Sequence, residues 1–576
     1  MHPALFLWMA LYFTKIINSR LVEWAEYNEV QREEQAGFRK GYSTIDNMFV
    51  LQALVQKYCS RKGGRFYTIF VDFSKAFDTI PHALLFYQLA TKGVHGKVLK
   101  VLRSMYSSLQ SCVRTQQGLT DFLNCSRGTR QGCMLSPFLF SLYVGELVQM
   151  FEDAQCEGVY IDENVPNITN LLFADDLAAG ADTVGRLQKM IDVISAFCSK
   201  WGLAVNLAKT KVVVFRNGGP LRQNEKWFFN GEKLEVVSIY KYLGAMFTTK
   251  LVWTQCQRTL AIQARKGLHL LRRYDYSCDG LPVDLQFELF DKMISPILLY
   301  GSELWGFAIA NHIERVQTDY CKYVMAVPSR TSNIAVLGDT GRYPMYVHYH
   351  KRCIKYWLNI LFMPETRFPK ACYKMLLNLH NHGRKTWASH VRALLYKYNF
   401  GDVWEAQGVG NMIVFFKEFV DRAKHVYLTE WEYDIAQSSK LYLFRSLKPS
   451  GINRENYLCT TTIRKYRSGL AKLRCASHDL QIEKGRHLGQ QVAERNCKLC
   501  HVHLDQIVLE DEYHFITCCP QYSDLRETYF PPWARVKSYE SFLSLLNNEE
   551  CDIINKLASY VYQANKLRWS RLNIAP

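Results

Sequence analysis

The sequence has no low-complexity tract, no repeat of fixed period and not the cysteine density of a small disulfide scaffold. The first two absences exclude an extended linker, a disordered tail and a solenoid. Its 18 cysteines among 576 residues lie mostly alone in apolar segments, as do Cys59, Cys133, Cys198 and Cys321. Disulfide scaffolds are short and dense in cysteine, so this pattern indicates a reducing, intracellular location, the cytoplasm and nucleus.

The sequence also offers no apolar run long enough to cross a membrane. The opening run PALFLWMALYF, residues 3–13, is too short for that. It lacks the basic start and the small-residue cleavage site of a signal peptide. We therefore expect a buried helix that continues through residues 14–21, and no membrane segment.

Apolar and aromatic residues, in contrast, are plentiful, at 48% and 14% of the chain. They suffice for several cores, and the length predicts about three or four compact units. Lys and Arg number 71 against 53 Asp and Glu, a net charge of +18. This excess suits a polyanionic partner such as nucleic acid, although ribosomal, membrane-surface and heparin-binding proteins share it.

The first 245 residues alternate strand-like and helical patterns, which is typical of an α+β or α/β core. Expected strands are 66–73, 171–175 and 204–215, and expected helices are 81–93 and 185–202. Pro81 suits the first turn of its helix, and Gly93 and Gly202 suit helix ends. From about residue 255 to 490 the pattern is mainly helical.

Two carboxylates, Asp175 and Asp176, interrupt the apolar stretch NLLFADDLAAGA, residues 170–181. One interpretation is an ordinary hairpin turn, which Asp favours. The other is a metal site, because the expected strand FYTIFVDF carries Asp72 near its end. Two strands of one sheet would bring Asp72 beside Asp175, and repulsion between them favours a counter-charge such as Mg²⁺.

Six blocks occur in a fixed order: QAGFRKGYSTIDN, FVDFSKAFDTIPHALL, RGTRQGCMLSPFLFSLY, LLFADDLAAGA, WGLAVNLAKTKVVVF and YKYLG. Together, over residues 35–244, they resemble the motifs of reverse transcriptases of non-LTR (LINE-type) retrotransposons. FDKMISPILLYGSELWG, residues 290–306, resembles the segment that follows the polymerase core in such elements. The resemblance implies a right-hand polymerase fold of fingers, palm and thumb.

The resemblance also implies catalytic roles. Asp72 and Asp175 match the aspartates that hold two Mg²⁺ ions, and Asp176 matches the second acid of the hairpin. Such ions stabilise the attacking and leaving oxygens of a phosphoryl transfer. Lys209 or Lys211 matches the lysine that protonates the pyrophosphate leaving group, the alternative being a surface strand lysine.

Substrate contacts follow in the same way. Arg39 matches the finger arginine that grips the triphosphate, and Phe77 matches an aromatic gate against the ribose 2′-hydroxyl. Core packing is the alternative for Phe77. Gln131 and Gly132 match the loop beneath the templating base and the incoming nucleotide. The implied partners are an RNA template, a DNA primer or target, and dNTPs.

Two departures from the family pattern stand out. Met134 replaces the proline of the usual GCPLSP, and neither an NYRPI-like finger block nor an endonuclease domain is found. We interpret the sequence as an N-terminally truncated copy or a late start, with a fingers remnant. A rival hypothesis is therefore a folded, inactive nucleic-acid-binding remnant of such an element.

A second constellation lies near the C-terminus, in CKLC followed by EDEYHFITCCPQYSDLR. Cys497 and Cys500, with His514 and either Cys518 or Cys519, have the spacing of a tetrahedral, structural Zn²⁺ site. Buried free thiols are the alternative interpretation. The CCHC motif at the end of LINE-type elements is similar and prefers Cys519, which precedes a proline; further competing ligands are Cys518, His501 and His503.

Residues 441–490 hold ten Lys and Arg against three Asp and Glu, interleaved with tyrosines. They are a candidate RNA contact or, equally, a solvated helical face. The expected order is a fingers remnant and palm over 1–245 and a thumb over 246–330. A basic helical connector over 331–490, a CCHC module over 491–530 and a helical tail over 531–576 complete it.

Overall fold

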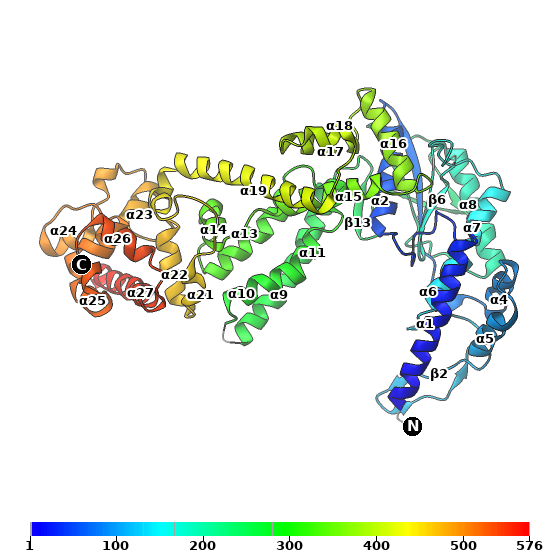
Figure 1. Ribbon diagram of the computed structural model, residues 1–576, viewed down its shortest axis with the longest axis horizontal. Helices are drawn as coiled ribbons and strands as arrows, with labels where there is room; N and C mark the ends of the chain where they lie inside the picture. Colours follow the sequence, from blue (N-terminus) through cyan, green and yellow to red (C-terminus); the bar gives the residue numbers. More distant parts are fainter. Residues whose placement is uncertain (1–2, 131, 166, 279, 575–576) are drawn as a thin grey trace.

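The computed structural model describes all residues except 1–2, 131, 166, 279 and 575–576. Figure 1 shows an elongated molecule with a sheet-containing lobe at the N-terminal end and a purely helical lobe at the C-terminal end. Green and yellow helices join the two. The predicted α+β class with a mainly helical C-terminal region is confirmed.

The main sheet has five strands in the order β11-β8-β1-β7-β6. Neighbouring strands are antiparallel except β11 and β8, which are parallel. The strands are β1 (Arg65–Val71), β6 (Asn170–Phe173), β7 (Asp176–Ala181), β8 (Lys211–Arg216) and β11 (Glu235–Val237). The predicted strands are therefore present, but 204–215 is a strand only in its second half.

Helices cover both faces of this sheet. Alternate residues of a strand point to opposite faces, so β1 supplies two cores. Phe66 and Phe70 pack with α2 (Thr44–Cys59) in one core, whereas Tyr67 and Ile69 pack with α8 (Val184–Trp201) in the other. This double burial explains why β1 reads as a continuous apolar run.

The two helices expected within the sheet lobe form as α4 (His82–Thr91) and α8. Pro81 caps the first, and Gly202 ends the second at φ +66°, a left-handed conformation that glycine adopts without strain. Helix α5 (Gly96–Ser107), α6 (Ser136–Val144) and α7 (Glu146–Asp153) complete this lobe.

The N-terminal apolar run is helical, as α1 (Pro3–Tyr27), but the prediction that this helix is buried is wrong. Trp8 and Tyr12 are 70% and 67% exposed, and the buried residues among those described lie further along, at Thr14, Leu21 and Ala25. The physical reason is visible in Figure 1, where the first half of α1 extends past the sheet lobe. No described helix is long and apolar enough to cross a membrane.

Helices follow the sheet without interruption. The longer ones are α9 (Thr254–Ser277), α10 (Val283–Leu289), α13 (Asn311–Met325), α14 (Asn333–Thr340), α15 (Met345–Leu361), α16 (Phe368–Asn381), α17 (Trp387–Lys397) and α19 (Met412–Gln437). The segment expected to be a connector returns to the sheet lobe, because α16 packs on α2 and the Trp387 ring lies 4.9 Å from that of Phe49. It is therefore part of the frame around the sheet.

The C-terminal lobe is built from short helices around one long one. Its elements include α21 (Asn456–Thr460), α22 (Arg464–Arg474), α24 (Lys498–Leu504), α25 (Ser523–Tyr529), α26 (Tyr539–Leu546) and α27 (Cys551–Ile574). Arg474 of α22 and Asp339 of α14 form a fully buried ion pair, with Nε 3.2 Å from Oδ2. This pair joins the lobe to the helices that follow the sheet.

Candidate active site and cysteine–histidine cluster

The three aspartates converge at one end of the sheet. Phe173 pairs with Asp176 across the β6–β7 hairpin, so Ala174 and Asp175 form its two-residue turn. Val71 pairs with Leu177 in the neighbouring ladder, which places Asp72 next to Asp176. Ala174 has φ +57°, a strained conformation for a residue with a side chain.

The carboxylates repel one another. Loss of hydration, then repulsion from Asp175 and Asp72, raises the pKa of Asp176 to about 6. Burial and the charges of Asp176 and Asp72 also raise the pKa of Tyr240 to about 12. Tyr240 stacks on Phe70 and belongs to the YKYLG block, but its closeness to the carboxylates was not predicted.

One lysine faces this cluster. Lys209 Nζ lies 3.5 Å from Asp72 Oδ2, whereas Lys211 Nζ lies 2.6 Å from Glu235 Oε2 at the sheet edge. The loop before β8 also holds the aspartate, since the backbone N–H of Asp72 donates to Thr210 Oγ1 at 3.2 Å. Of the two lysines left open by the sequence, the structure thus places Lys209 at the carboxylates.

Gln35 braces the hairpin and was missed from the sequence. Its Oε1 accepts hydrogen bonds from the backbone N–H of Ala174 at 3.2 Å and of Gly37 at 2.9 Å, and its Nε2 donates to the Ala174 carbonyl at 3.4 Å. The backbone on either side of Gln35 pairs with Leu172 of β6. A Cβ on Gly37 would lie 2.2 Å from Ala174 N, so only glycine fits there. The QAGF sequence block, which contains both Gln35 and Gly37, is the feature of the sequence that could have indicated this contact.

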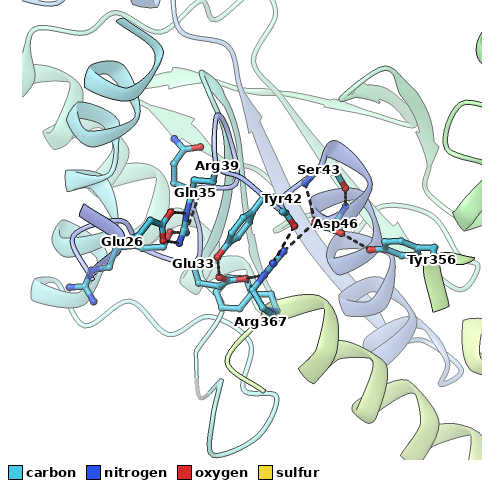
Figure 2. Close-up of polar contacts among 12 residues, drawn as sticks. Glu26, Glu33, Gln35, Arg39, Tyr42, Ser43, Asp46, Tyr356 and Arg367 are labelled. Atoms are coloured by element: carbon cyan, nitrogen blue, oxygen red, sulfur yellow. Dashed lines mark hydrogen bonds and ion pairs between the residues drawn. The ribbon is translucent and has the colours of Figure 1, made fainter. Parts of the chain in front are cut away.

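Arg39 does not join the carboxylate cluster. Its side chain is 7% exposed and forms a two-bond ion pair with Glu26 of α1, at 3.0 and 2.9 Å. Figure 2 shows this pair and the ring of Tyr42, which lies 4.1 Å from the guanidinium carbon. Arg39 would therefore have to leave Glu26 in order to bind a phosphate.

A second arginine clamps the same loop from the helical region. Arg367, directly before α16, lies 2.9 Å from Glu33 Oε1 and 3.3 Å from Asp46 Oδ2 (Figure 2). Its guanidinium carbon lies 3.6 Å from the centre of the Tyr42 ring, so Tyr42 contacts two guanidinium groups. Tyr356 of α15 donates to Asp46 at 3.0 Å. The downstream helices thus hold the loop that carries Gln35 and Arg39.

Three predicted substrate contacts remain, Phe77, Gln131 and Gly132. Phe77 is half-buried and stacks on Phe140, with ring centres 4.0 Å apart, so its packing role is present whatever else it contacts. Gly132 is exposed with φ +81°, a conformation suited to glycine. Gln131 lies outside the described residues.

The second predicted constellation forms a compact cluster in the C-terminal lobe. The ligand atoms of Cys497, Cys500, His514 and Cys519 all lie within 4.8 Å of one another, and all four residues are buried. Cys500 Sγ lies 3.4 Å from His514 Nε2 and 3.6 Å from Cys519 Sγ. Hydrogen bonding from Cys519 lowers the pKa of the Cys497 thiol.

The cluster has the donor set expected from the sequence. Cys519 belongs to it and Cys518 does not. The other two competitors, His501 and His503, are exposed on α24. Three sulfur atoms and one imidazole nitrogen, converging without an intervening side chain, fit a tetrahedral metal with no open position.

Residues 11–247 match the family described as reverse transcriptase (RNA-dependent DNA polymerase). The chain is 24% identical over 323 residues to the probable RNA-directed DNA polymerase from transposon BS of Drosophila melanogaster, covering 53% of this chain and 33% of that protein. It is 26% identical over 275 residues to the Pol polyprotein of the type-1 retrotransposable element R2 of Popillia japonica, covering 46% and 37%.

The chain therefore spans about a third of the length of these relatives. Among solved structures, apo telomerase from Candida tropicalis aligns with 71% of this chain and 60% of its own, at 11% identity and a TM-score of 0.34.

We predict that Asp176→Asn raises thermal stability at pH 7.5 but not at pH 4. The pKa of Asp176 in the folded protein, about 6, exceeds its ordinary value of 3.8. Proton binding therefore stabilises the fold below pH 3.8, and this stabilisation is lost as the pH rises through 6. Melting curves in EDTA at both pH values measure the difference. Asp121→Asn, at an exposed loop aspartate, is the matched control; equal shifts for both variants would contradict the prediction.

Proposed function

Because residues 11–247 form a reverse transcriptase domain related to those of non-LTR transposable elements, as the motifs predicted, we propose that the chain synthesises DNA on an RNA template. The reaction is attack of a primer 3′-hydroxyl on the α-phosphate of a dNTP. The observation that carries the proposal is the convergence of Asp72, Asp175 and Asp176 at the hairpin of this domain.

The donor set fits divalent cations. The carboxylates are acceptor-only oxygens with one nearby cationic side chain, Lys209, and their mutual repulsion is relieved by added positive charge. Asp72 and Asp175 would hold two Mg²⁺ ions, which when bound supply the positive charge that phosphoryl transfer requires. Asp176 adds negative charge beside them.

Neighbouring residues have distinct tasks in this reaction. Lys209 is 68% exposed and contacts Asp72, so it can turn toward a leaving pyrophosphate and donate a proton. Phe77 would stand against the sugar 2′ position. Arg39 would exchange Glu26 for the triphosphate, a move within one loop that Arg367 keeps in place.

The cysteine–histidine cluster is proposed as a structural zinc site. Its metal would join the start of α24, with Cys497 and Cys500, to the π-helical turn His514–Cys518 and the Cys519 that follows it. No disulfide joins these two segments among the described residues. Such a site contributes folding free energy to the lobe and takes no part in the chemistry.

We expect Asp175→Asn to abolish Mg²⁺-dependent primer extension while the protein stays folded. The substitution keeps the shape of the side chain but removes its charge, and a neutral amide is a weaker ligand for a hard cation. Extension on a primed RNA template with dNTPs measures the effect, and Asp121→Asn controls for loss of an exposed carboxylate. Parental extension rates in Asp175→Asn would refute the catalytic assignment.

Gln35→Ala should slow extension by roughly ten- to a hundredfold without unfolding the sheet lobe, because a small displacement of Asp175 is costly in phosphoryl transfer. The Mg²⁺ concentration needed for half-maximal rate should rise, since Gln35 acts through the turn that carries Asp175. A purely structural role would lower the melting temperature and leave this requirement unchanged. Gln110→Ala, at an exposed position, is the control.

Purified protein should carry about one equivalent of zinc, lost in Cys519→Ser and retained in Cys518→Ser. Metal analysis by mass spectrometry reads out both variants. Chelation should make the C-terminal lobe susceptible to protease and leave the sheet lobe resistant. Absence of zinc from gently purified parent protein, or equal zinc in the two variants, would rule the assignment out.

A further inference from the structure

A cavity of about 1020 Å³ lies between the helices that follow the sheet and the C-terminal lobe. Helix α9 contributes Asp275 and Tyr276 to its lining, α13 contributes Tyr323, and the start of α22 contributes Arg464 and Arg467. Neither the carboxylate site nor the cysteine–histidine cluster includes any of these residues.

Arg467 is a buried cation with unused hydrogen-bonding capacity. Its side chain is 5% exposed, and its Nε has no hydrogen-bond partner. Nη1 donates to the carbonyl of Thr461 at 3.3 Å, and no described residue places a carboxylate in ion-pair contact with the guanidinium. Burial and the nearby charge of Arg464 lower the pKa of Arg467. Asp275 acts on Arg467 only through space. A buried cation without a direct ion pair is unfavourable, so this group is suited to receive an anion.

The one carboxylate on the cavity wall is already satisfied. Asp275 accepts hydrogen bonds from Tyr323 at 2.6 Å and from the backbone of Leu281 at 2.7 Å, and Arg464 Nη1 lies 3.6 Å from its Oδ2. The Tyr323 ring also contacts Arg272, whose guanidinium carbon is 4.6 Å from the ring centre. The wall therefore keeps a positive excess around Arg467.

The backbone adds to this excess. Helix α22 spans 11 residues and begins at Arg464, and its N-cap residue, Ile463, supplies no side-chain hydrogen bond. The first N–H groups of a helix carry partial positive charge and bind phosphate oxygens. Ile463 and Arg464 line the cavity, so this helix start faces the same space as Arg467.

Tyr276 lies at the opening of the cavity and is 90% exposed. An aromatic ring in water beside a phosphate-sized cationic pocket matches the way proteins bind unpaired strands, with the backbone in the charged groove and a base stacked on the ring. A duplex would keep its bases stacked within the helix and leave Tyr276 unused.

We propose that this cavity binds a single-stranded nucleic-acid segment, with one phosphate at Arg467 and the start of α22 and a base on Tyr276. This proposal rests on the proposed function. A polymerase that uses an RNA template must hold single-stranded nucleic acid outside the carboxylate site. It lies where the helices after the sheet meet the C-terminal lobe (Figure 1).

The test uses the full chain and fluorescein-labelled 12-nucleotide uridine and deoxyuridine oligomers, with binding followed by anisotropy from low to high salt. Arg467→Gln should weaken binding roughly five- to twentyfold and lower the slope of log affinity against log salt by about 0.7. Lys465→Gln is the matched control, since it removes a charge from the same helix at a residue outside the cavity lining, and should stay within about twofold. A loss confined to the uridine oligomer identifies RNA as the ligand, and equal loss identifies either strand.

Two further readouts separate binding from folding. Arg467→Gln should unfold at the same temperature as the parent or higher without nucleic acid, because it removes an uncompensated charge. Tyr276→Ala changes an exposed residue and should weaken binding roughly five- to a hundredfold with an unchanged salt slope. Equal affinities for Arg467→Gln and Lys465→Gln, or parental affinity in Tyr276→Ala, would overturn the proposal. These measurements stand apart from primer extension, so a failed catalytic assignment would show in Asp175→Asn alone.

Discussion

Mutual repulsion among Asp72, Asp175 and Asp176 is the constraint around which the sheet lobe is organised. Three carboxylates at the end of adjacent strands do not stay together unless other parts of the chain hold the backbone that carries them. Burial and, after it, this repulsion raise the pKa of Asp176. The neighbouring backbone is held on two sides, by Gln35 at the Ala174 turn and by Thr210 at Asp72. The strained φ of Ala174 persists because Gln35 fixes both polar groups of that residue.

The brace on the hairpin depends in turn on helices far away in the sequence. Gln35 lies on a loop that also carries Glu33, Arg39 and Tyr42, and Arg367 binds this loop from the start of α16 (Figure 2). Tyr356 and the packing of α16 on α2 extend the same contact. The helical region is therefore a structural partner of the site, and a change at Arg367 can reach Asp175 through one loop and two hydrogen bonds.

The C-terminal lobe is stabilised by a different set of contacts. It combines one long helix with several short ones, and buried polar groups lie within its apolar core. The Arg474–Asp339 pair ties it to α14, and the cysteine–histidine cluster brings together residues from two segments, 497–500 and 514–519. Other buried ion pairs of this lobe, such as Arg568 with Glu510, take up part of the chain's positive charge. Arg467 is the contrasting case, a buried cation beside a cavity, with no carboxylate in direct ion-pair contact among the described residues and no hydrogen-bond partner at its Nε.

The sequence by itself determined the main order of elements, the strands that end in carboxylates and three donors of the cluster, and it left the fourth donor open between Cys518 and Cys519. These follow from local pattern, because periodicity, capping residues and motif spacing are properties of neighbouring residues. The exposure of α1, the role of Gln35 and the pairing of Arg39 with Glu26 could not be read in this way. Each depends on which residues from distant parts of the chain lie nearby in the folded protein. Leu172 and Ala174 lie beside Gln35, whereas no described residue covers Trp8. Only the tertiary structure distinguished Lys209 from Lys211. Although they are two residues apart, the ammonium group of Lys209 lies near Asp72 and that of Lys211 lies near Glu235. Local chemistry thus decided which groups were available, and packing decided which of them meet.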